Sequence, residues 1–238
     1  RLSNKIPPFT HFIAAPFQLI FGPGNDQALL MNLVFSGVLM LVVYGIGQRL
    51  FNRSVGLWSA AIALLMPRLT FPRLYYVTDF PLAAVTPLAF CCLTYWYFAQ
   101  TRRAQWLWVI GFGISAGCAL MTKQTALFFL FVPTGFSLAA QLWQKQWVRV
   151  LQLLCGLLLS LPIWGIWYRT NFIYLFSTYE RANVASAARE GDPPLNTLGA
   201  WVYYWLDLPQ AIAWILLLVP LVGIALHLLR RFPTQNAK

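Results

Sequence analysis

The sequence has little charge, and most of the charge that it has is of one sign. Only 10% of its 238 residues are charged, with 17 lysines and arginines but only six aspartates and glutamates. A typical soluble domain has roughly 25% charged residues, whereas the mean hydropathy here is +0.63. This composition excludes a water-soluble globular domain and predicts a multi-pass integral membrane protein.

The sequence is also poor in residues that build metal or redox sites. It has only two histidines, His11 and His227, which fall on opposite predicted membrane faces. The four cysteines lie inside apolar runs, and their spacing fits neither a metal site nor a disulfide framework: Cys91, Cys92, Cys118 and Cys155. We therefore expect inert buried thiols, no metal and no cofactor. The start at Arg1 has no signal-peptide pattern, so we expect a piece of a longer chain.

What the sequence does have is long apolar runs. A membrane-spanning helix needs about 20 mostly apolar residues. Seven runs approach this length: 28–48, 54–70, 80–99, 105–121, 124–142, 150–168 and 206–229. The apolar stretch 7–22 is shorter and interrupted by Pro16, so it predicts a helix at the membrane interface. The polar stretch 170–200 predicts a surface loop. We expect an all-α bundle that forms one transmembrane domain over residues 1–238.

The basic residues at the turns suggest an orientation. One set of turns has nine cations and no acid: Arg49, Arg53, Arg102, Arg103, Lys145, Arg149, Arg230, Arg231 and Lys238. The opposite set has eight cations together with all six acids of the chain. Cytoplasmic turns are enriched in lysine and arginine. We therefore predict that the purely basic end is cytoplasmic and that every carboxylate lies on the other face.

The mixed-charge face contains the candidate site. The stretch "PRLTFPRLYYVTDFPLAA", residues 67–84, carries Arg68, Arg73 and Asp79 between two apolar runs. A carboxylate near the bilayer costs a few kcal/mol, which favours a function. Lys5 and Lys123 are cations at other span ends on the same predicted face. Cations at headgroup depth are suited to phosphate oxygens. Tyr75 and Tyr76 could stack on a sugar ring.

Each of these residues also has a simpler explanation. "TDFP" is a good capping sequence, so Asp79 could only start a helix. Lys123 could extend to the headgroups, and the tyrosines could belong to an aromatic belt. "GISAG", residues 113–117, matches a serine-hydrolase pattern, but that pattern requires a strand before a helix. Within an apolar helix, the two glycines of this segment predict close helix packing.

Four motifs resemble those of a known family. They are "NKIPPFTHFIAAPFQLIFGPGN", "GIGQRLFNRSVGLWSAAIALLMP", "YYVTDFPLA" and "GISAGCALMTKQTALF". In this order and spacing they resemble the bacterial membrane enzymes of glycosyltransferase family 39, which includes protein O-mannosyltransferases and aminoarabinose transferases. The resemblance is good over residues 4–140 and thin beyond them.

The resemblance implies the C-type glycosyltransferase fold and a hexosyl or pentosyl transferase that uses a polyprenyl-phosphate sugar. It also implies a bacterial inner membrane, with the active site on the non-cytoplasmic face. Lys5 would match the family's lysine near the donor phosphate, Asp79 its second-loop aspartate, and Lys123 a lysine at a later outer turn. The family's catalytic base lies before the Lys-Pro-Pro element. We therefore expect this sequence to lack that base, the first membrane helix and most of the first outer loop.

The residues and the resemblance together predict a membrane glycosyltransferase. Its partners would be a polyprenyl-phosphate sugar donor, membrane lipid and an acceptor of unknown type, with no nucleic acid. Transfer from a phosphate carrier needs a base for the acceptor hydroxyl and cations for the leaving phosphate. As a catalytic-site residue, Asp79 would then bind a sugar or acceptor hydroxyl, or hold an arginine in place. The alternatives are a transporter or lipid flippase, which would use intramembrane charges and broken helices, and a purely structural membrane subunit.

Overall fold

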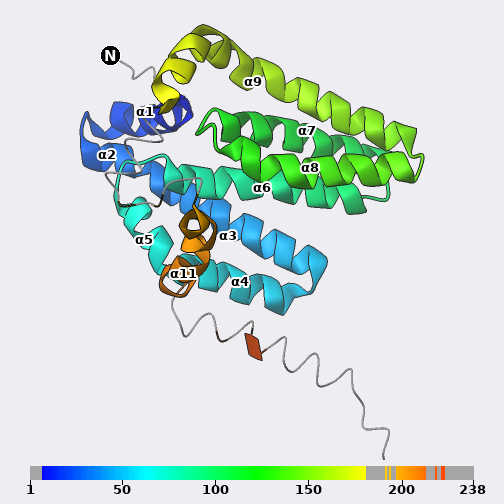
Figure 1. Cartoon of the computed structure of the whole chain (residues 1–238), viewed down its shortest axis with the longest axis horizontal. Coiled ribbons are helices and arrows are strands. Elements are labelled where there is room, and N and C mark those ends of the chain that lie inside the picture. The colour runs from blue at the N-terminus through cyan, green and yellow to red at the C-terminus, as the bar shows by residue number, and fades with distance from the viewer. Residues whose placement is uncertain are drawn as a thin grey trace, which may run out of the picture.

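The computed structural model describes residues 7–180, 191, 193, 197–212, 218 and 221–222, and within them it contains helices and no strand. Figure 1 labels the helices α1 (Phe9–Phe21), α2 (Asn25–Leu29), α3 (Met31–Leu50), α4 (Arg53–Leu65), α5 (Pro67–Leu74), α6 (Asp79–Phe98), α7 (Arg102–Leu120), α8 (Ala126–Trp143), α9 (Trp147–Glu180) and α11 (Leu198–Ile212). The prediction of an all-α polytopic bundle is confirmed.

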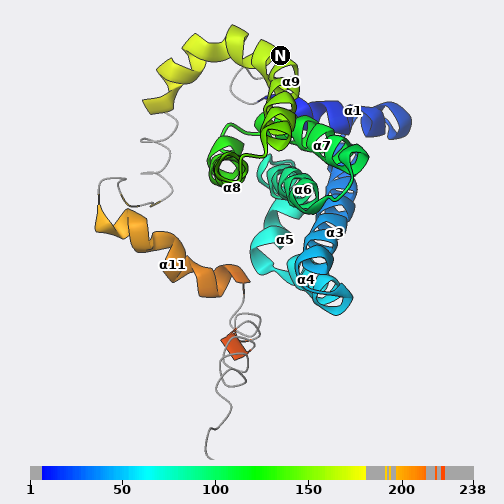
Figure 2. The same cartoon turned by 90° about the vertical axis from the view of Figure 1, so that its right-hand side faces the viewer.

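Helix α6 is the central helix of the bundle. It packs against α3 on one side and α7 on another, and α7 in turn packs against α9. Figure 2 shows α6 surrounded by α3, α7 and α8. The apolar window of α6 is 61% buried, against 28% for each of the other three candidate spans. Its side chains Phe80 and Trp96 are fully buried in a core shared with Phe112 of α7 and Leu153 of α9.

The structure supports fewer spans than the seven predicted. Among the described residues, four helical segments are long and apolar enough to cross a membrane: Asn25–Leu50, Asp79–Phe98, Ala126–Trp143 and Trp147–Phe172. A fifth is added if α4 and α5 together form one broken span. Helix α7 has 19 residues but begins with Arg102 and Arg103 and is less apolar. Most of the predicted span 206–229 lies outside the described residues.

The predicted span 54–70 is not one continuous helix, because the chain breaks at Met66. Helices α4 and α5 meet there at an angle of 59°. Met66 has ψ of 120°, an extended conformation, because the ring of Pro67 disfavours helical backbone in the residue before it. The bend places Arg68 and Arg73 on a short separate helix next to the start of α6.

Two other boundaries differ from the prediction. Helix α1 continues through Pro16, so this proline does not end it. Helix α9 runs on to Glu180, into the stretch 170–200 that we expected to be a loop. No glycine or proline lies between Gly165 and Gly191 to stop it.

Helix α1 runs across the bundle instead of along it. Figure 2 looks along α6, α7 and α8 and shows α1 lengthwise, whereas Figure 1 shows those spans lengthwise. Its 13 residues extend about 20 Å at 1.5 Å per residue, well short of the roughly 30 Å hydrocarbon core. Both features fit the interfacial helix that the sequence predicts.

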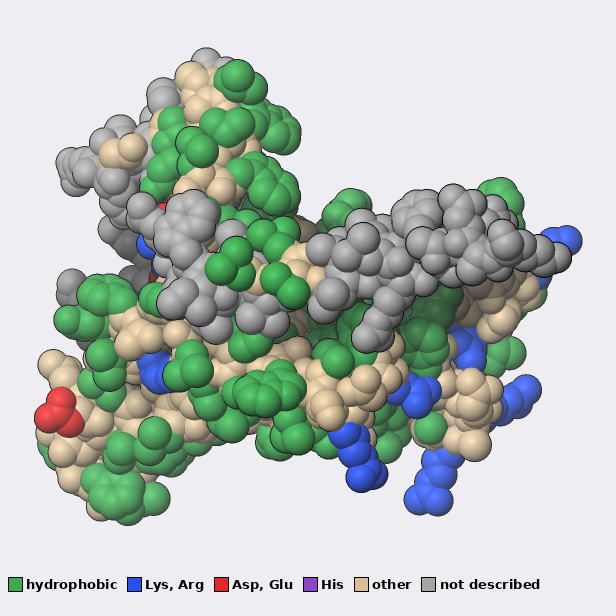
Figure 3. Space-filling view, turned by 90° about the horizontal axis from the view of Figure 1, so that it is seen from below, with side chains coloured by type: hydrophobic (Ala, Val, Ile, Leu, Met, Phe, Trp, Pro, Cys, Tyr) green, Lys and Arg blue, Asp and Glu red, His purple; other side chains and the backbone are tan. Residues whose placement is uncertain are grey.

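The basic turns meet at one end of the bundle. Arg49 of α3 donates a hydrogen bond to the carbonyl oxygen of Phe98 at 2.9 Å. Arg149 of α9 donates to the carbonyl oxygens of Tyr97 at 2.7 Å and Ala99 at 2.9 Å. Both arginines thus satisfy free carbonyls at the carboxyl end of α6, where cations are favoured. Figure 3 shows lysine and arginine side chains gathered at this end of the molecule.

Close packing of α7 on α9 explains the "GISAG" segment. A Cβ atom on Gly113 would lie 2.3 Å from the backbone oxygen of Gly156, and one on Gly117 would lie 2.9 Å from Ile163. Ser115 is 4% exposed, and its hydroxyl donates to the carbonyl oxygen of Gly111 at 2.6 Å. The packing prediction is therefore confirmed, and the serine has no access to a substrate.

Candidate functional site

An ion pair joins two of the predicted site residues at the end of the bundle opposite the basic turns. Lys123 Nζ lies 2.6 Å from Asp79 Oδ1, although the residues are 44 positions apart. Asp79 is the first residue of α6, and the helix dipole favours an acid at the amino-terminal end of a helix. Lys123 lies in the turn between α7 and α8. The side chain of Asp79 is 56% exposed and that of Lys123 is 39% exposed, so a ligand can reach both.

The structure places Asp79 one residue after the N-cap of α6. The N-cap of α6 is Thr78, which makes no side-chain capping hydrogen bond, and Asp79 is the first helical residue. Within the described part of the chain, the carboxylate of Asp79 pairs with Lys123 and not with an arginine or the helix backbone. Asp79 therefore lies in the first turn of α6 and not at its cap.

Arg73 lies beside the start of α6 with its guanidinium only partly satisfied. Its Nη2 donates to the carbonyl oxygen of Leu64 at 3.1 Å, one of the carbonyls that the break before Pro67 leaves free. Its Cζ lies 5.3 Å from the ring centroid of Phe80. Its Nε is buried without a hydrogen-bond partner. In the part of the chain that the structure describes, no carboxylate forms an ion pair with Arg73.

Helix α1 packs against the end of the bundle that carries the Asp79–Lys123 pair. The backbone N–H of Phe9 donates to the carbonyl oxygen of Met121 at 3.2 Å, which ties α1 to the turn that carries Lys123. His11 Nδ1 lies 2.7 Å from the hydroxyl oxygen of Tyr76. Burial raises the pKa of Tyr76 above its ordinary value of 10.0. The phenol therefore stays protonated at neutral pH and can donate this hydrogen bond to His11.

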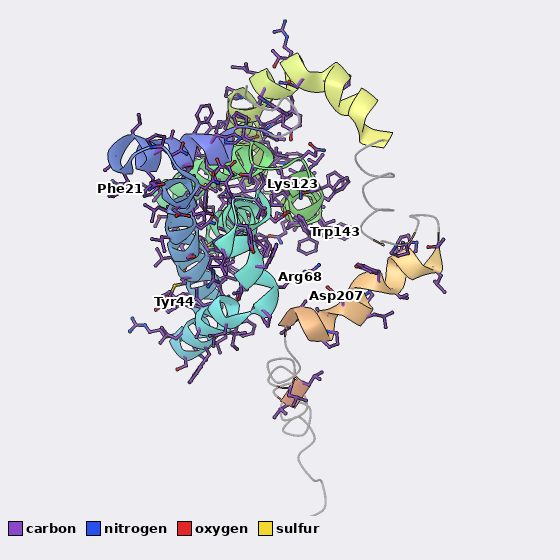
Figure 4. All side chains as sticks on the ribbon, turned by 90° about the vertical axis from the view of Figure 1, so that its left-hand side faces the viewer. Phe21, Tyr44, Arg68, Lys123, Trp143 and Asp207 are labelled. Atoms are coloured by element: carbon purple, nitrogen blue, oxygen red, sulfur yellow. The ribbon has the colours of Figure 1, made fainter. Side chains whose placement is uncertain are left out.

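The other predicted site residues that the structure describes do not join the ion pair. Arg68 Nη2 lies 3.8 Å from Asp207 Oδ2 of α11. Figure 4 shows this second pair between α5 and α11, apart from Lys123. Tyr75 stacks on Phe71, with ring centroids 4.3 Å apart. Lys5 lies outside the described residues.

Two residues that shape this end were not predicted from the sequence. Asn32 of α3 is 3% exposed, and its Nδ2 donates to the carbonyl oxygens of Arg73 at 2.8 Å and Tyr75 at 3.2 Å. It thereby holds the segment before Asp79 against α3. His11, considered above only as a metal ligand, anchors Tyr76 instead. Among the described residues, no three His, Cys, Asp or Glu side chains come together as a metal site would require.

The fold and this site define a class of protein. It is an integral membrane protein whose bundle carries, at one end, a cation–carboxylate pair next to the turn that α1 contacts. Residues 1–179 match the model of the dolichyl-phosphate-mannose-protein mannosyltransferase family. The chain belongs to this family, which confirms the resemblance noted in the sequence.

One curated relative adds detail. The chain is 28% identical over 223 residues to the undecaprenyl phosphate-alpha-4-amino-4-deoxy-L-arabinose arabinosyl transferase 2 of Proteus mirabilis (strain HI4320). The match covers 84% of this chain and 37% of the relative, so the chain spans little more than a third of that protein's length. No solved structure matches the chain.

Proposed function

We propose that this protein is a membrane glycosyltransferase that moves a sugar from a polyprenyl-phosphate carrier to an acceptor hydroxyl. The reaction would take place at the Asp79–Lys123 end, and that end would face the non-cytoplasmic side. The observation that carries the proposal is the accessible Asp79–Lys123 ion pair, which lies where α6 and α8 begin. Family membership supports the reaction class, and the name of the Proteus mirabilis relative supports an undecaprenyl-phosphate carrier.

The residues at this end have distinct roles in the proposed reaction. The bond between the anomeric carbon and the carrier phosphate breaks, and the acceptor oxygen forms the new bond while its proton passes to a base. Negative charge grows on the leaving phosphate, and preorganised cations stabilise it. Lys123 and Arg73 are suited to that task. Lys5 belongs to the same proposal by resemblance, whereas the pairing of Arg68 with Asp207 does not favour a role for Arg68.

Asp79 is proposed to orient a hydroxyl and not to remove its proton. When a donor phosphate takes its place beside Lys123, the carboxylate is released and can accept a hydrogen bond from a sugar or acceptor hydroxyl. Hydrogen bonds to a charged group contribute about 1.5–3 kcal/mol. Tyr75 and Tyr76 border this position in the sequence and are suited to stack on a sugar ring.

The transporter alternative is less consistent with this arrangement. Transporter sites lie near the bilayer midplane, where interrupted helices expose their ends. Here the Asp79–Lys123 pair and Arg73 lie at helix ends on one side of the bundle.

The test is sugar transfer from a labelled polyprenyl-phosphate donor by membranes that contain the full-length enzyme. We expect Asp79→Asn to lower transfer about ten- to hundredfold, because a neutral amide accepts a weaker hydrogen bond from the substrate hydroxyl than a charged carboxylate does. The matched control is Asp26→Asn, which removes an exposed first-turn acid of α2 and should leave transfer unchanged. Wild-type transfer by Asp79→Asn at normal membrane levels would mean that Asp79 only starts a helix.

A further inference from the structure

Helix α5 is not fixed in place by its own packing. It has eight residues, none of them buried, and it meets α4 at an angle of 59°. The last carbonyl groups of a helix also have no partner within that helix. Arg73 lies in this last turn of α5. Contacts from neighbouring elements must therefore determine where Arg73 lies.

Asn32 of α3 provides such a contact from inside the core. It is 3% exposed and follows Met31, which is fully buried. Its Nδ2 donates to the carbonyl oxygens of Arg73 at 2.8 Å and Tyr75 at 3.2 Å. The amide nitrogen carries two hydrogens, so both bonds can form at once. The carboxyl end of α5 is thereby tied to the packed core of the bundle.

Two further contacts hold the side chain of Arg73. Its Nη2 donates to the carbonyl oxygen of Leu64 at 3.1 Å, and its Cζ lies 5.3 Å from the ring centroid of Phe80, which is fully buried. Among the described residues, Arg73 Nε and Asn32 Oδ1 are buried without a hydrogen-bond partner. Buried polar atoms of this kind cost stability. The joint between α3 and α5 therefore favours one position of the guanidinium over maximum stability.

We infer that Asn32 is a positioning residue, which holds the Arg73 guanidinium where the phosphate of a lipid-linked donor can meet it. This inference rests on the proposed function. Because it is almost completely buried, Asn32 does not touch the substrate and acts through Arg73. Without its amide, the carboxyl end of α5 loses its tie to α3. Ordering the guanidinium on the phosphate then costs part of the free energy of binding.

The experiment is a double-mutant cycle in the full-length, detergent-purified protein, with the affinity for undecaprenyl phosphate as the measurement. We expect Asn32→Ala to bind about fivefold more weakly or worse, since one neutral hydrogen bond typically contributes about this factor. Because Asn32 acts through Arg73, the double variant should bind no more weakly than Arg73→Ala alone. The control is Ser36→Ala, which removes a hydroxyl on α3 that donates to the carbonyl oxygen of Asn32 at 2.7 Å. It should bind as the wild type does.

The outcomes separate this inference from the proposed function. If the losses of Asn32→Ala and Arg73→Ala multiply in the double variant, Asn32 acts through general packing and the inference is overturned. Unchanged affinity in Asn32→Ala also overturns it and leaves the proposed function in place. If Arg73→Ala binds as the wild type does, the proposed role of Arg73 fails, and the inference fails with it.

Thermal unfolding of each variant checks that the fold is kept. If Asn32→Ala does not fold, Asn32→Ser takes its place in the same cycle, because serine retains one donor but is too short to make both bonds. The expected result and the contradicting results are then the same.

Discussion

At the scale of the residue, the Asp79–Lys123 pair contributes little to stability. Ion pairs between exposed side chains contribute about 0–1 kcal/mol, and here the side chains are 56% and 39% exposed. The pair is therefore better explained by what it can bind than by what it holds together. Replacing either partner should leave the fold intact, so effects on function can be measured in folded protein.

Arg73 gives the first residue-scale prediction. We expect Arg73→Lys to weaken donor binding nearly as much as Arg73→Ala, about ten- to hundredfold, because only the planar guanidinium can hold the Leu64 carbonyl and a phosphate together. Donor titration of detergent-purified protein measures this. The control is Arg103→Lys, an exposed arginine at the opposite end, which should bind as the wild type does. A fully functional Arg73→Lys protein would remove Arg73 from the site.

Part of this site could be predicted from the sequence. Charges are scarce in an apolar chain, so Asp79 and Lys123 are conspicuous, although the sequence does not show that they touch. Asn32 could not be found in this way. It is one neutral polar residue in an apolar run, and its partners are carbonyls 41 and 43 positions away. The pairing of Arg68 with Asp207 likewise depends on where α11 lies, which no local pattern indicates.

At the scale of the element, the contact between α7 and α9 depends on glycine. A Cβ at Gly113 would meet the Gly156 backbone oxygen at 2.3 Å, whereas a Cβ at Gly165 of α9 would meet nothing within 4 Å. We expect Gly113→Ala to destabilise the protein by about 1–3 kcal/mol through overpacking. Gly165→Ala should be neutral or slightly stabilising, because alanine favours helix.

Thermal unfolding of both variants in the same detergent measures the difference. Equal midpoints would contradict the close packing of these two helices.

The sequence predicted the contact between α7 and α9 because small residues four apart mark a packing face. It did not predict the break at Met66, although α5 begins with Pro67 and is less apolar than α4. Composition determines whether a segment can be buried in lipid, while the backbone chemistry of single prolines determines where it bends.

At the scale of the whole molecule, the topology can be tested directly. Gln124 and Gln144 are both exposed and lie in turns at the two ends of α8. In a cysteine-free background, we expect an impermeant maleimide to label Gln124→Cys from the non-cytoplasmic side of intact cells or spheroplasts. Gln144→Cys should react only after the membrane is opened. The reverse pattern would invert the orientation and place the site in the cytoplasm.

The central claim is that the Lys123 end binds the phosphate of a lipid-linked sugar. The most direct measurement compares donor affinity in Lys123→Ala and Lys145→Ala, since each variant removes one lysine from a turn at an end of α8. Loss of one charge-assisted hydrogen bond of about 1.5–3 kcal/mol predicts roughly ten- to hundredfold weaker binding for Lys123→Ala. Lys145→Ala should bind as the wild type does. Unchanged affinity in Lys123→Ala, or an equal loss in both variants, would contradict the account.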